Sequence, residues 1–139
     1  MNECFFCKVI KKDPLDNLIL ENEYALTTAD SYFREGHCTV IVKRHIRSVS
    51  ELEQKEYNSI FKLIKKVSTA LEKKYDCEKT YLLSIGDKVN HLHFHLIPKH
   101  TDKCSMGMYC FERLFEIEGE RKSSDSERNM LANEIKKLL

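Results

Sequence analysis

The sequence has no long hydrophobic run, and no stretch approaches the roughly 20 consecutive apolar residues that a membrane-spanning helix requires. Residues 1–12, MNECFFCKVIKK, also lack the basic lead and long apolar stretch of a secretory signal peptide. We therefore expect a cytoplasmic protein with no membrane partner, in a compartment that keeps thiols reduced. In that compartment its six cysteines are expected to be metal ligands or buried small hydrophobes, and not a disulfide framework.

A large excess of charge is absent too. The formal net charge is +1, so the composition gives no strong attraction to nucleic acid or to a membrane surface. No internal repeat or low-complexity segment is present. With 139 residues, 42% hydrophobic and 32% charged, the chain has the size and composition of one globular domain, which we expect to cover residues 1–139. A small ligand or a protein is the expected partner.

Hydrophobic patterning predicts the strands. Apolar and β-branched runs indicate strands over 18–20, 24–28, 38–42, 80–85 and 91–97. Polar residues between the first two runs indicate a tight hairpin. Because the predicted strands are mostly linked by hairpins, they favour an antiparallel sheet.

Three helical segments are expected. The main one is an amphipathic helix of about 25 residues that follows a capping box of Ser50 and Glu53 and ends near residues 75–76. A short helical knuckle is expected at the amino terminus, and a helical tail over 120–139. The segment 104–115 is expected to be a loop or weak strand. The fold class is α+β, with one long central helix and a C-terminal helix.

The stretch NHLHFHLIPK, residues 90–99, places His91, His93 and His95 at alternate positions. In a strand, alternate side chains share a face, so we expect the three imidazoles on one face and the intervening apolar residues against the core. A single histidine would be an ordinary polar residue on a half-buried strand. Three histidines at alternate positions of one strand indicate a functional site.

Two functional interpretations of this row stay open. Histidines at alternate strand positions can present two nitrogens to one zinc ion. Alternatively, a neutral imidazole can attack a phosphorus centre and form a covalent intermediate, while neighbouring imidazoles orient it or donate protons to phosphate oxygens. His93 has a partner on each side and is the expected nucleophile.

A Cys-x-x-Cys pair near the amino terminus suggests a metal site. Such pairs occur in zinc knuckles and in redox motifs, but the redox version normally begins a helix in a βαβ unit, which is not apparent here. One histidine follows the predicted strand 38–42, and another begins the triad strand. We expect a tetrahedral zinc site, with the knuckle spanning residues 1–14, formed by Cys4, Cys7, His45 and His91. The alternative is that both cysteines are simply reduced and half-buried.

Together these segments resemble the histidine triad family, specifically its zinc-carrying bacterial branch. HLHFHLIPK resembles the family signature, CFFCKVI the opening of the zinc-carrying branch, and GHCTVIVKRHI the family's Gly-His strand. ENEYALTTAD resembles the strand pair that delivers an acidic residue to a nucleoside ribose. The resemblance covers most of the chain. It implies an antiparallel sheet of about five strands flanked by helices, usually paired as a homodimer.

The resemblance also implies cleavage or transfer at the α-phosphorus of a dinucleoside polyphosphate, a phosphoramidate or an adenylylated small molecule. His93 would become nucleotidylated, His95 would donate to phosphate oxygens, and His37 would support the pocket. Asp30 would bind the ribose, and Lys88 would place positive charge near the phosphates. The zinc on the four residues above would be structural, with no organic cofactor.

One stretch departs from the family pattern. Many members carry an Asn-x-Gly and then an Ala-Gly-Gln segment before the triad, whereas SIGDKVNHLHFH is shorter, has Ser84 in place of the Asn and lacks the Gln. Contacts with the leaving group are therefore expected to differ. A nucleotide-binding sensor without significant catalysis, and a zinc hydrolase with a catalytic metal on the histidine row, are the alternative functions.

Overall fold

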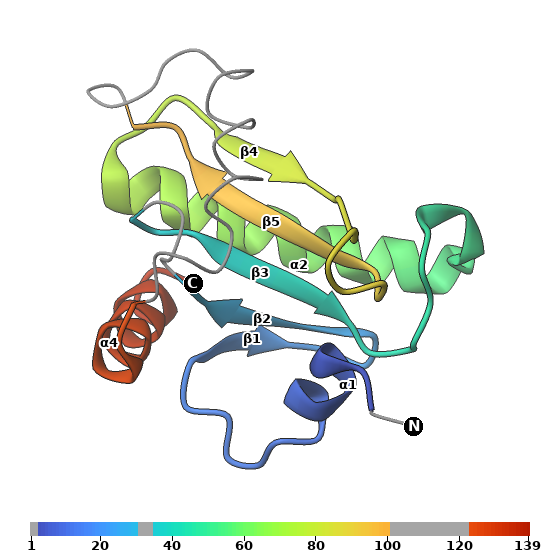
Figure 1. Cartoon of the computed structure of the whole chain (residues 1–139). Coiled ribbons are helices and arrows are strands. Elements are labelled where there is room, and N and C mark those ends of the chain that lie inside the picture. Colours follow the sequence, from blue (N-terminus) through green and yellow to red (C-terminus); the bar gives the residue numbers. More distant parts are fainter. Residues whose placement is uncertain (1–2, 31–34, 101–122) are drawn as a thin grey trace.

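Figure 1 shows a computed structural model of the chain, in which residues 3–30, 35–100 and 123–139 are described. One sheet runs in the order β1-β2-β3-β5-β4, and every neighbouring pair in it is antiparallel. Its strands are β1 (Leu18–Glu21), β2 (Ala25–Ala29), β3 (Cys38–Val42), β4 (Thr80–Leu83) and β5 (His93–Pro98). The helices are α1 (Phe5–Ile10), α2 (Gln54–Tyr75), α4 (Asp125–Lys136) and a 3-10 turn, η1 (Val49–Glu51). The expected α+β fold is confirmed.

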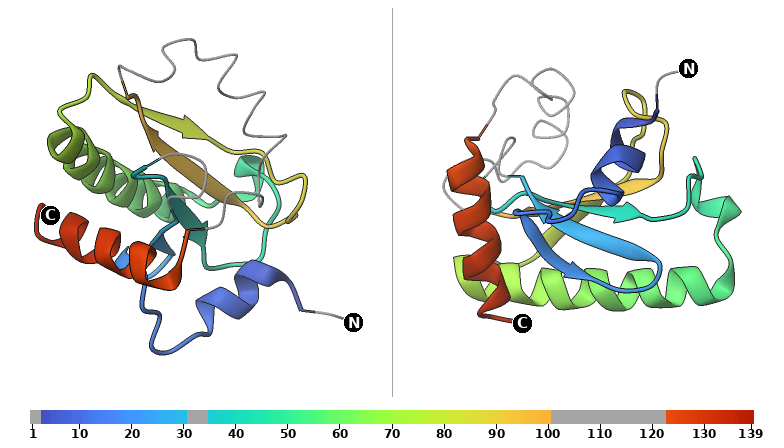
Figure 2. Two further views of the ribbon diagram at one scale, coloured as in Figure 1. Left: turned by 60° about the vertical axis from the view of Figure 1, so that its left-hand side comes forward. Right: turned by 90° about the horizontal axis from the view of Figure 1, so that it is seen from below.

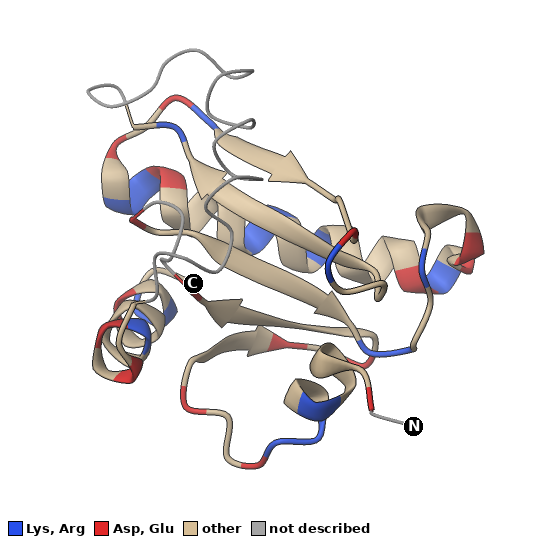
Figure 3. Ribbon diagram, in the orientation of Figure 1, with Lys and Arg blue, Asp and Glu red and all other residues tan. Residues whose placement is uncertain are grey.

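The sheet separates two sides of the molecule. Helix α2 runs along one face, α1 lies against the opposite face, and α4 packs beside β1 and β2 (Figure 2). Buried side chains of α2 and α4 join one face of the sheet in a single core. Strands β2 to β5 contain no charged residue, and the Lys, Arg, Asp and Glu side chains lie mainly on helices and loops (Figure 3). No described helix has the length and apolar character needed to span a membrane.

Every residue of the central strands β3 and β5 is buried, so successive side chains alternate between the core face and a second buried face. On β3 and β5 the core face carries Cys38, Val40, Val42, Phe94 and Leu96. The other face carries two cross-strand pairs, Ile41 with His93 and Thr39 with His95. The apolar residues between the histidines therefore face the core, as predicted.

The triad strand is shorter than predicted. β5 begins at His93, because the His91 backbone N–H donates to Val89 O at 2.8 Å and closes a turn just before the strand. Only His93 and His95 share a face of β5. His91 precedes the strand, but its ring contacts Phe6 on the same side of the sheet as His93 while Leu92 joins the core, so only the predicted start of the strand is wrong.

The start of the long helix was also misplaced. A capping box of Ser48 and Glu51 begins η1, and a second box of Glu53 and Glu56 begins α2, so the predicted Ser50–Glu53 box is wrong. Leu52 is extended and separates the two helices. α2 consequently has 22 residues and ends at Tyr75, as expected.

Two further boundaries differ from the prediction. β4 ends at Leu83, two residues before the predicted end. In the C-terminal tail, predicted over 120–139, α4 covers Asp125–Lys136, and Ser124 caps it by accepting from the Glu127 N–H at 3.1 Å. Segment 104–115 lies outside the described residues.

One glycine fixes the entry into β3. Gly36 has φ +87°, and a Cβ at this position would collide with the ring of Tyr75 and lie 2.8 Å from Pro98 Cγ. The last residue of α2 thus packs directly on the backbone that leads to His37. Only glycine fits both this conformation and this close contact.

Candidate active site

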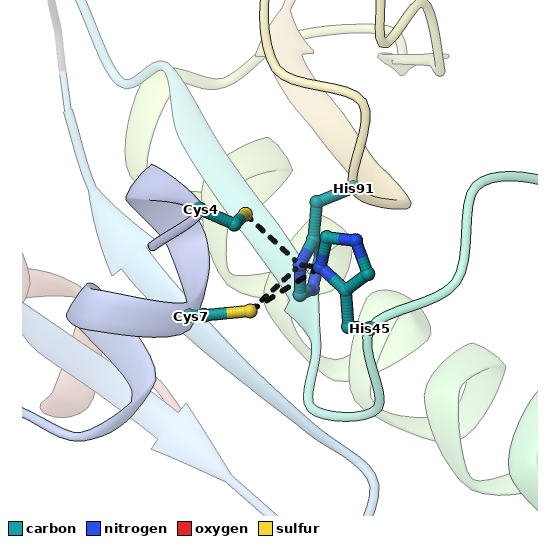
Figure 4. Close-up of side chains that lie close together, drawn as sticks. All are labelled: Cys4, Cys7, His45 and His91. Atoms are coloured by element: carbon teal, nitrogen blue, oxygen red, sulfur yellow. Dashed lines mark hydrogen bonds between the residues drawn. The ribbon is translucent and has the colours of Figure 1, made fainter. Parts of the chain in front are cut away.

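Four potential metal ligands meet at one point (Figure 4). Cys4 and Cys7 come from the start of α1, His45 from the segment after β3, and His91 from the turn before β5. The two histidine Nδ1 atoms are 3.1 Å apart, and the sulfur atoms lie 3.3 to 3.6 Å from the imidazole nitrogens they face. All four ligand atoms lie within 4.8 Å of one another.

This cluster fits a zinc ion. Zn–N bonds of about 2.0–2.1 Å and Zn–S bonds of about 2.3 Å place tetrahedral ligand atoms roughly 3.3–3.8 Å apart. The four nitrogen–nitrogen and sulfur–nitrogen separations given above, 3.1 to 3.6 Å, fall in or just below this range. His91 Nε2 donates to Val42 O at 2.6 Å, which leaves the Nδ1 lone pair directed at the cysteines, as in a metal-bound histidine. Four protein ligands are typical of a structural zinc site.

Helix α1 covers the triad. None of its residues is buried, yet the ring of Phe6 lies 4.5 Å from the ring of His93 and 5.9 Å from that of His91, centroid to centroid. Because Phe6 lies between Cys4 and Cys7, the residues that bring the cysteines to His91 also bring an aromatic ring onto His93.

The hydrogen bonding of His93 suits a nucleophile. Its Nδ1 lies 2.6 Å from the backbone oxygen of His91, and a carbonyl can only accept, so Nδ1 carries the proton. The Nε2 atom of neutral His93 therefore carries the lone pair. Burial lowers the pKa of His93 below its ordinary value, so the ring is neutral at neutral pH.

The neighbouring histidines form a buried pair. His37 Nε2 and His95 Nδ1 are 2.9 Å apart, and the His95 ring lies 5.0 Å from that of His93. Burial lowers the pKa of His95 to about 4 and that of His37 well below its ordinary value, so both rings are neutral. Among the described residues nothing hydrogen-bonds to the buried His95 Nε2. A buried polar atom of this kind is usually satisfied by a ligand or water.

A cavity of about 660 Å³ opens beside His93. This volume lies in the range of small-molecule sites, roughly 300–1,000 Å³. Apolar side chains from α1, the following loop and β3 form much of its wall. Three expected substrate-site residues line it, namely His93, Asp30 and Lys88. His95 lies beside His93 on the sheet, and His37 beside His95, but neither lines the cavity.

Asp30 occupies a polar corner of this cavity. Its carboxylate accepts from Thr39 Oγ1 in a short hydrogen bond and from Thr28 Oγ1 at 3.4 Å. Burial raises the pKa of Asp30 to about 6, although the Thr39 hydrogen bond and the charge of Arg128 oppose this rise. The carboxyl is therefore mostly ionised at neutral pH.

Sequence reasoning missed several residues of the site. Phe6 was read only as part of the Cys-x-x-Cys segment, and Thr39 only as part of a β-branched strand. Arg128 lines the cavity from α4, 98 positions after Asp30, and no local pattern links the two. Alternation along β3 is the signal that could have placed Thr39 on the same face as Ile41.

Comparisons with known proteins match this architecture. A model of the HIT domain family matches residues 11–102. The adenosine 5′-monophosphoramidase of Schizosaccharomyces pombe is 31% identical over 107 residues, which are 76% of this chain and 80% of that protein.

Solved structures show the same fold. A Hit-like protein involved in cell-cycle regulation from Bartonella henselae has a TM-score of 0.78 and 19% identity, over 100% of this chain and 98% of that one. A zinc-bound histidine triad family protein from Mycobacterium smegmatis has a TM-score of 0.71 and 20% identity, over 97% and 91% of the two chains.

The raised pKa of Asp30 predicts a measurable pH dependence of stability. An unfolded Asp ionises near 3.8 and the folded Asp30 near 6, so between these values the folded state binds more protons and the unfolding free energy falls as pH rises. Urea unfolding at pH 5 and pH 7 should show that the unfolding free energy of wild type falls by about 1–2 kcal/mol more than that of Asp30→Asn between the two pH values. Asp16→Asn, which removes an exposed carboxyl, should show the same fall in unfolding free energy as wild type. Equal slopes in wild type and Asp30→Asn would refute the raised pKa.

Proposed function

Because the chain belongs to the HIT domain family, we propose that it is a nucleotide hydrolase or transferase acting at the α-phosphorus of a nucleoside phosphate derivative through a nucleotidyl-histidine. The observation that carries the proposal is the tautomer of His93, which leaves the Nε2 lone pair on a ring at the cavity wall. The relative from Schizosaccharomyces pombe supports adenosine 5′-monophosphoramidate as the first substrate to test.

The reaction proceeds by two displacements. His93 Nε2 attacks the α-phosphorus and forms an N–P bond while the bond from phosphorus to the leaving group breaks; an amine leaving group takes a proton from solvent, and a nucleotide departs as its anion. Water then attacks the same phosphorus and loses a proton to solvent, the N–P bond breaks, and the nucleoside monophosphate and neutral His93 are released. When the acceptor is not water, the same intermediate gives transfer. Two in-line displacements retain the configuration at phosphorus.

The hydrogen bond on the far side of the ring stabilises the intermediate. A nucleotidyl group on Nε2 leaves His93 cationic, with its remaining proton on Nδ1. The carbonyl oxygen of His91, 2.6 Å away, accepts that proton's hydrogen bond and lies where the positive charge develops. The same contact fixes the ring orientation before the attack.

His95 and His37 assist at the phosphate. If His37 Nε2 donates to His95 Nδ1, then His95 carries its proton on Nε2, the buried atom that lacks a partner among the described residues. We propose that this N–H donates to a phosphate oxygen of a substrate that extends from the cavity past His93 to the buried His95 ring, which does not itself line the cavity. Asp30, which lines the same cavity, binds the ribose hydroxyls, and Lys88 adds positive charge near the phosphates.

The metal is structural in this proposal. Zinc on the four clustered residues would hold α1 against the turn that contains His91, and would supply rigidity without activating water. The zinc-bound relative from Mycobacterium smegmatis has the same fold. His91 would serve as a zinc ligand through its ring while its backbone orients His93.

Replacing the nucleophile should abolish turnover and spare the fold. We expect His93→Ala to lose at least about 10³-fold in kcat with adenosine 5′-monophosphoramidate, while AMP binding and the melting temperature stay close to wild type. The matched control is His100→Ala, because His100 contacts Tyr75 and Glu35 outside the cavity. Near-wild-type turnover in His93→Ala would refute the assignment. Tight AMP binding by an inactive wild type would instead select the sensor function.

Removing the metal should lower the thermal stability of the protein before it affects turnover. Wild type should contain one zinc per chain, and Cys4→Ala with Cys7→Ala should abolish zinc binding and lower the Tm by at least about 5 °C, a shift worth roughly 1–2 kcal/mol in a domain of this size. Cys77→Ala, outside the cluster, should keep the zinc. If a chelator stops turnover at once without changing the Tm, the metal is catalytic.

A homodimer is the assembly we propose. Among the described strands β4 lies at an edge of the sheet, with Leu82 43% exposed on it, and the nearby α2 exposes Phe61 and Tyr57. A sheet edge beside exposed apolar side chains is suited to packing against a second copy. Light scattering should give twice the chain mass; the mass of a single chain at high concentration would contradict the dimer.

A further inference from the structure

We propose that Arg128 of α4 is a positioning residue for Asp30, and that it acts with Ser123 to complete the ribose end of the cavity from a segment beyond the matched family domain. This inference rests on the proposed function in one respect, the binding of ribose hydroxyls by Asp30. It adds a residue from a helix that follows residue 102, where the family match ends.

Three residues form a connected chain of hydrogen bonds. Ser123 Oγ donates to the backbone oxygen of Asp30, and Arg128 Nη1 donates to the backbone oxygen of Ser123, both through short contacts. The same Nη1 also lies 3.4 Å from Ser123 Oγ. Arg128 is therefore tied to the backbone of Asp30 through one intervening residue.

Arg128 also faces the ligand space. Arg128, Asp125 and Asn129 line the same cavity as Asp30 and His93. The guanidinium is partly exposed and pairs through Nη2 with Asp125. Its positive charge favours the carboxylate form of Asp30, against the burial that disfavours it. The side chain thus affects both the position and the charge of Asp30.

Arg128 lies close to the amino-terminal end of α4, where the helix dipole favours acidic side chains and disfavours positive ones. The helix does not depend on it for docking, because Leu131, Ala132 and Ile135 are buried in the main core. The cation at this position is held by Asp125 and by the Ser123 backbone, and it is close enough to Asp30 to favour the ionised form of that carboxyl.

Positioning of Asp30 matters only for ligands that have ribose hydroxyls. A carboxylate accepts hydrogen bonds from both hydroxyls when it is ionised and correctly oriented. AMP should therefore depend on Arg128, whereas 2′,3′-dideoxy-AMP, which lacks these hydroxyls, should not. This difference distinguishes positioning of Asp30 from a general effect on the fold.

Calorimetry with these two nucleotides tests the inference. Arg128→Gln should weaken AMP binding about 10-fold and dideoxy-AMP binding less than about 2-fold, as expected for loss of one charge-assisted contact. Ser123→Ala should likewise weaken AMP binding more than dideoxy-AMP binding. Arg128→Lys should retain part of the preference for AMP. Adding Arg128→Gln to Asp30→Asn should produce no further loss, because both changes act on one contact.

The control is Glu134→Gln, which removes the ion pair of α4 with Lys74, 2.6 Å long, away from the cavity. It should leave the preference for AMP unchanged. The inference is overturned if Arg128→Gln weakens the binding of both nucleotides equally or of neither. It is also overturned if the double variant loses as much AMP affinity as the sum of the losses in Arg128→Gln and Asp30→Asn. If Asp30→Asn itself leaves the preference unchanged, the ribose role of Asp30 fails and the inference falls with it. The His93 assignment is tested separately by turnover.

Discussion

The hydrogen bond from His93 Nδ1 to the backbone oxygen of His91 joins the two halves of the site. His91 uses three polar groups at once. Its carbonyl orients His93, its Nε2 donates to Val42 at the end of β3, and its Nδ1 faces the two cysteines. The position of the nucleophile therefore depends on a residue that is itself held by the sheet and by the cysteine cluster.

Burial explains why these histidines are neutral. The sheet is covered on both faces, by α2 on one and in part by α1 on the other (Figure 2). Desolvation lowers the pKa of His93, His95 and His37, so the face opposite α2 contains neutral imidazoles that can act as donors or as a nucleophile at neutral pH. The cavity beside them is also lined by Asp30, whose carboxyl is mostly ionised at neutral pH.

Local patterns predicted much of this arrangement. Strict alternation in HLHFHLI correctly assigned Phe94 and Leu96 to the core, and helical spacing correctly gave the end of α2. The spacing of the cysteines and of His45 and His91 predicted a cluster that the fold does bring together. These features could be predicted because each depends on neighbours in sequence or on a known ligand geometry.

The remaining features depend on contacts that no local pattern encodes. His91 leaves the strand because its amide bonds to Val89, and a period-2 pattern cannot reveal such a turn. The capping box was placed two residues late, because Ser48 and Ser50 each have an acidic residue three positions later. Arg128 reaches the cavity only because α4 packs beside β1 and β2.

A quenched-reaction experiment tests the central claim most directly. Wild-type protein is mixed with adenosine 5′-monophosphoramidate, denatured within the first turnovers and digested for mass spectrometry under conditions that preserve N–P bonds. The account predicts an adenylyl group on the peptide that contains residues 91–97, localised to His93. An adduct on any other residue, or active enzyme that inverts the configuration at phosphorus and forms no adduct, would contradict it.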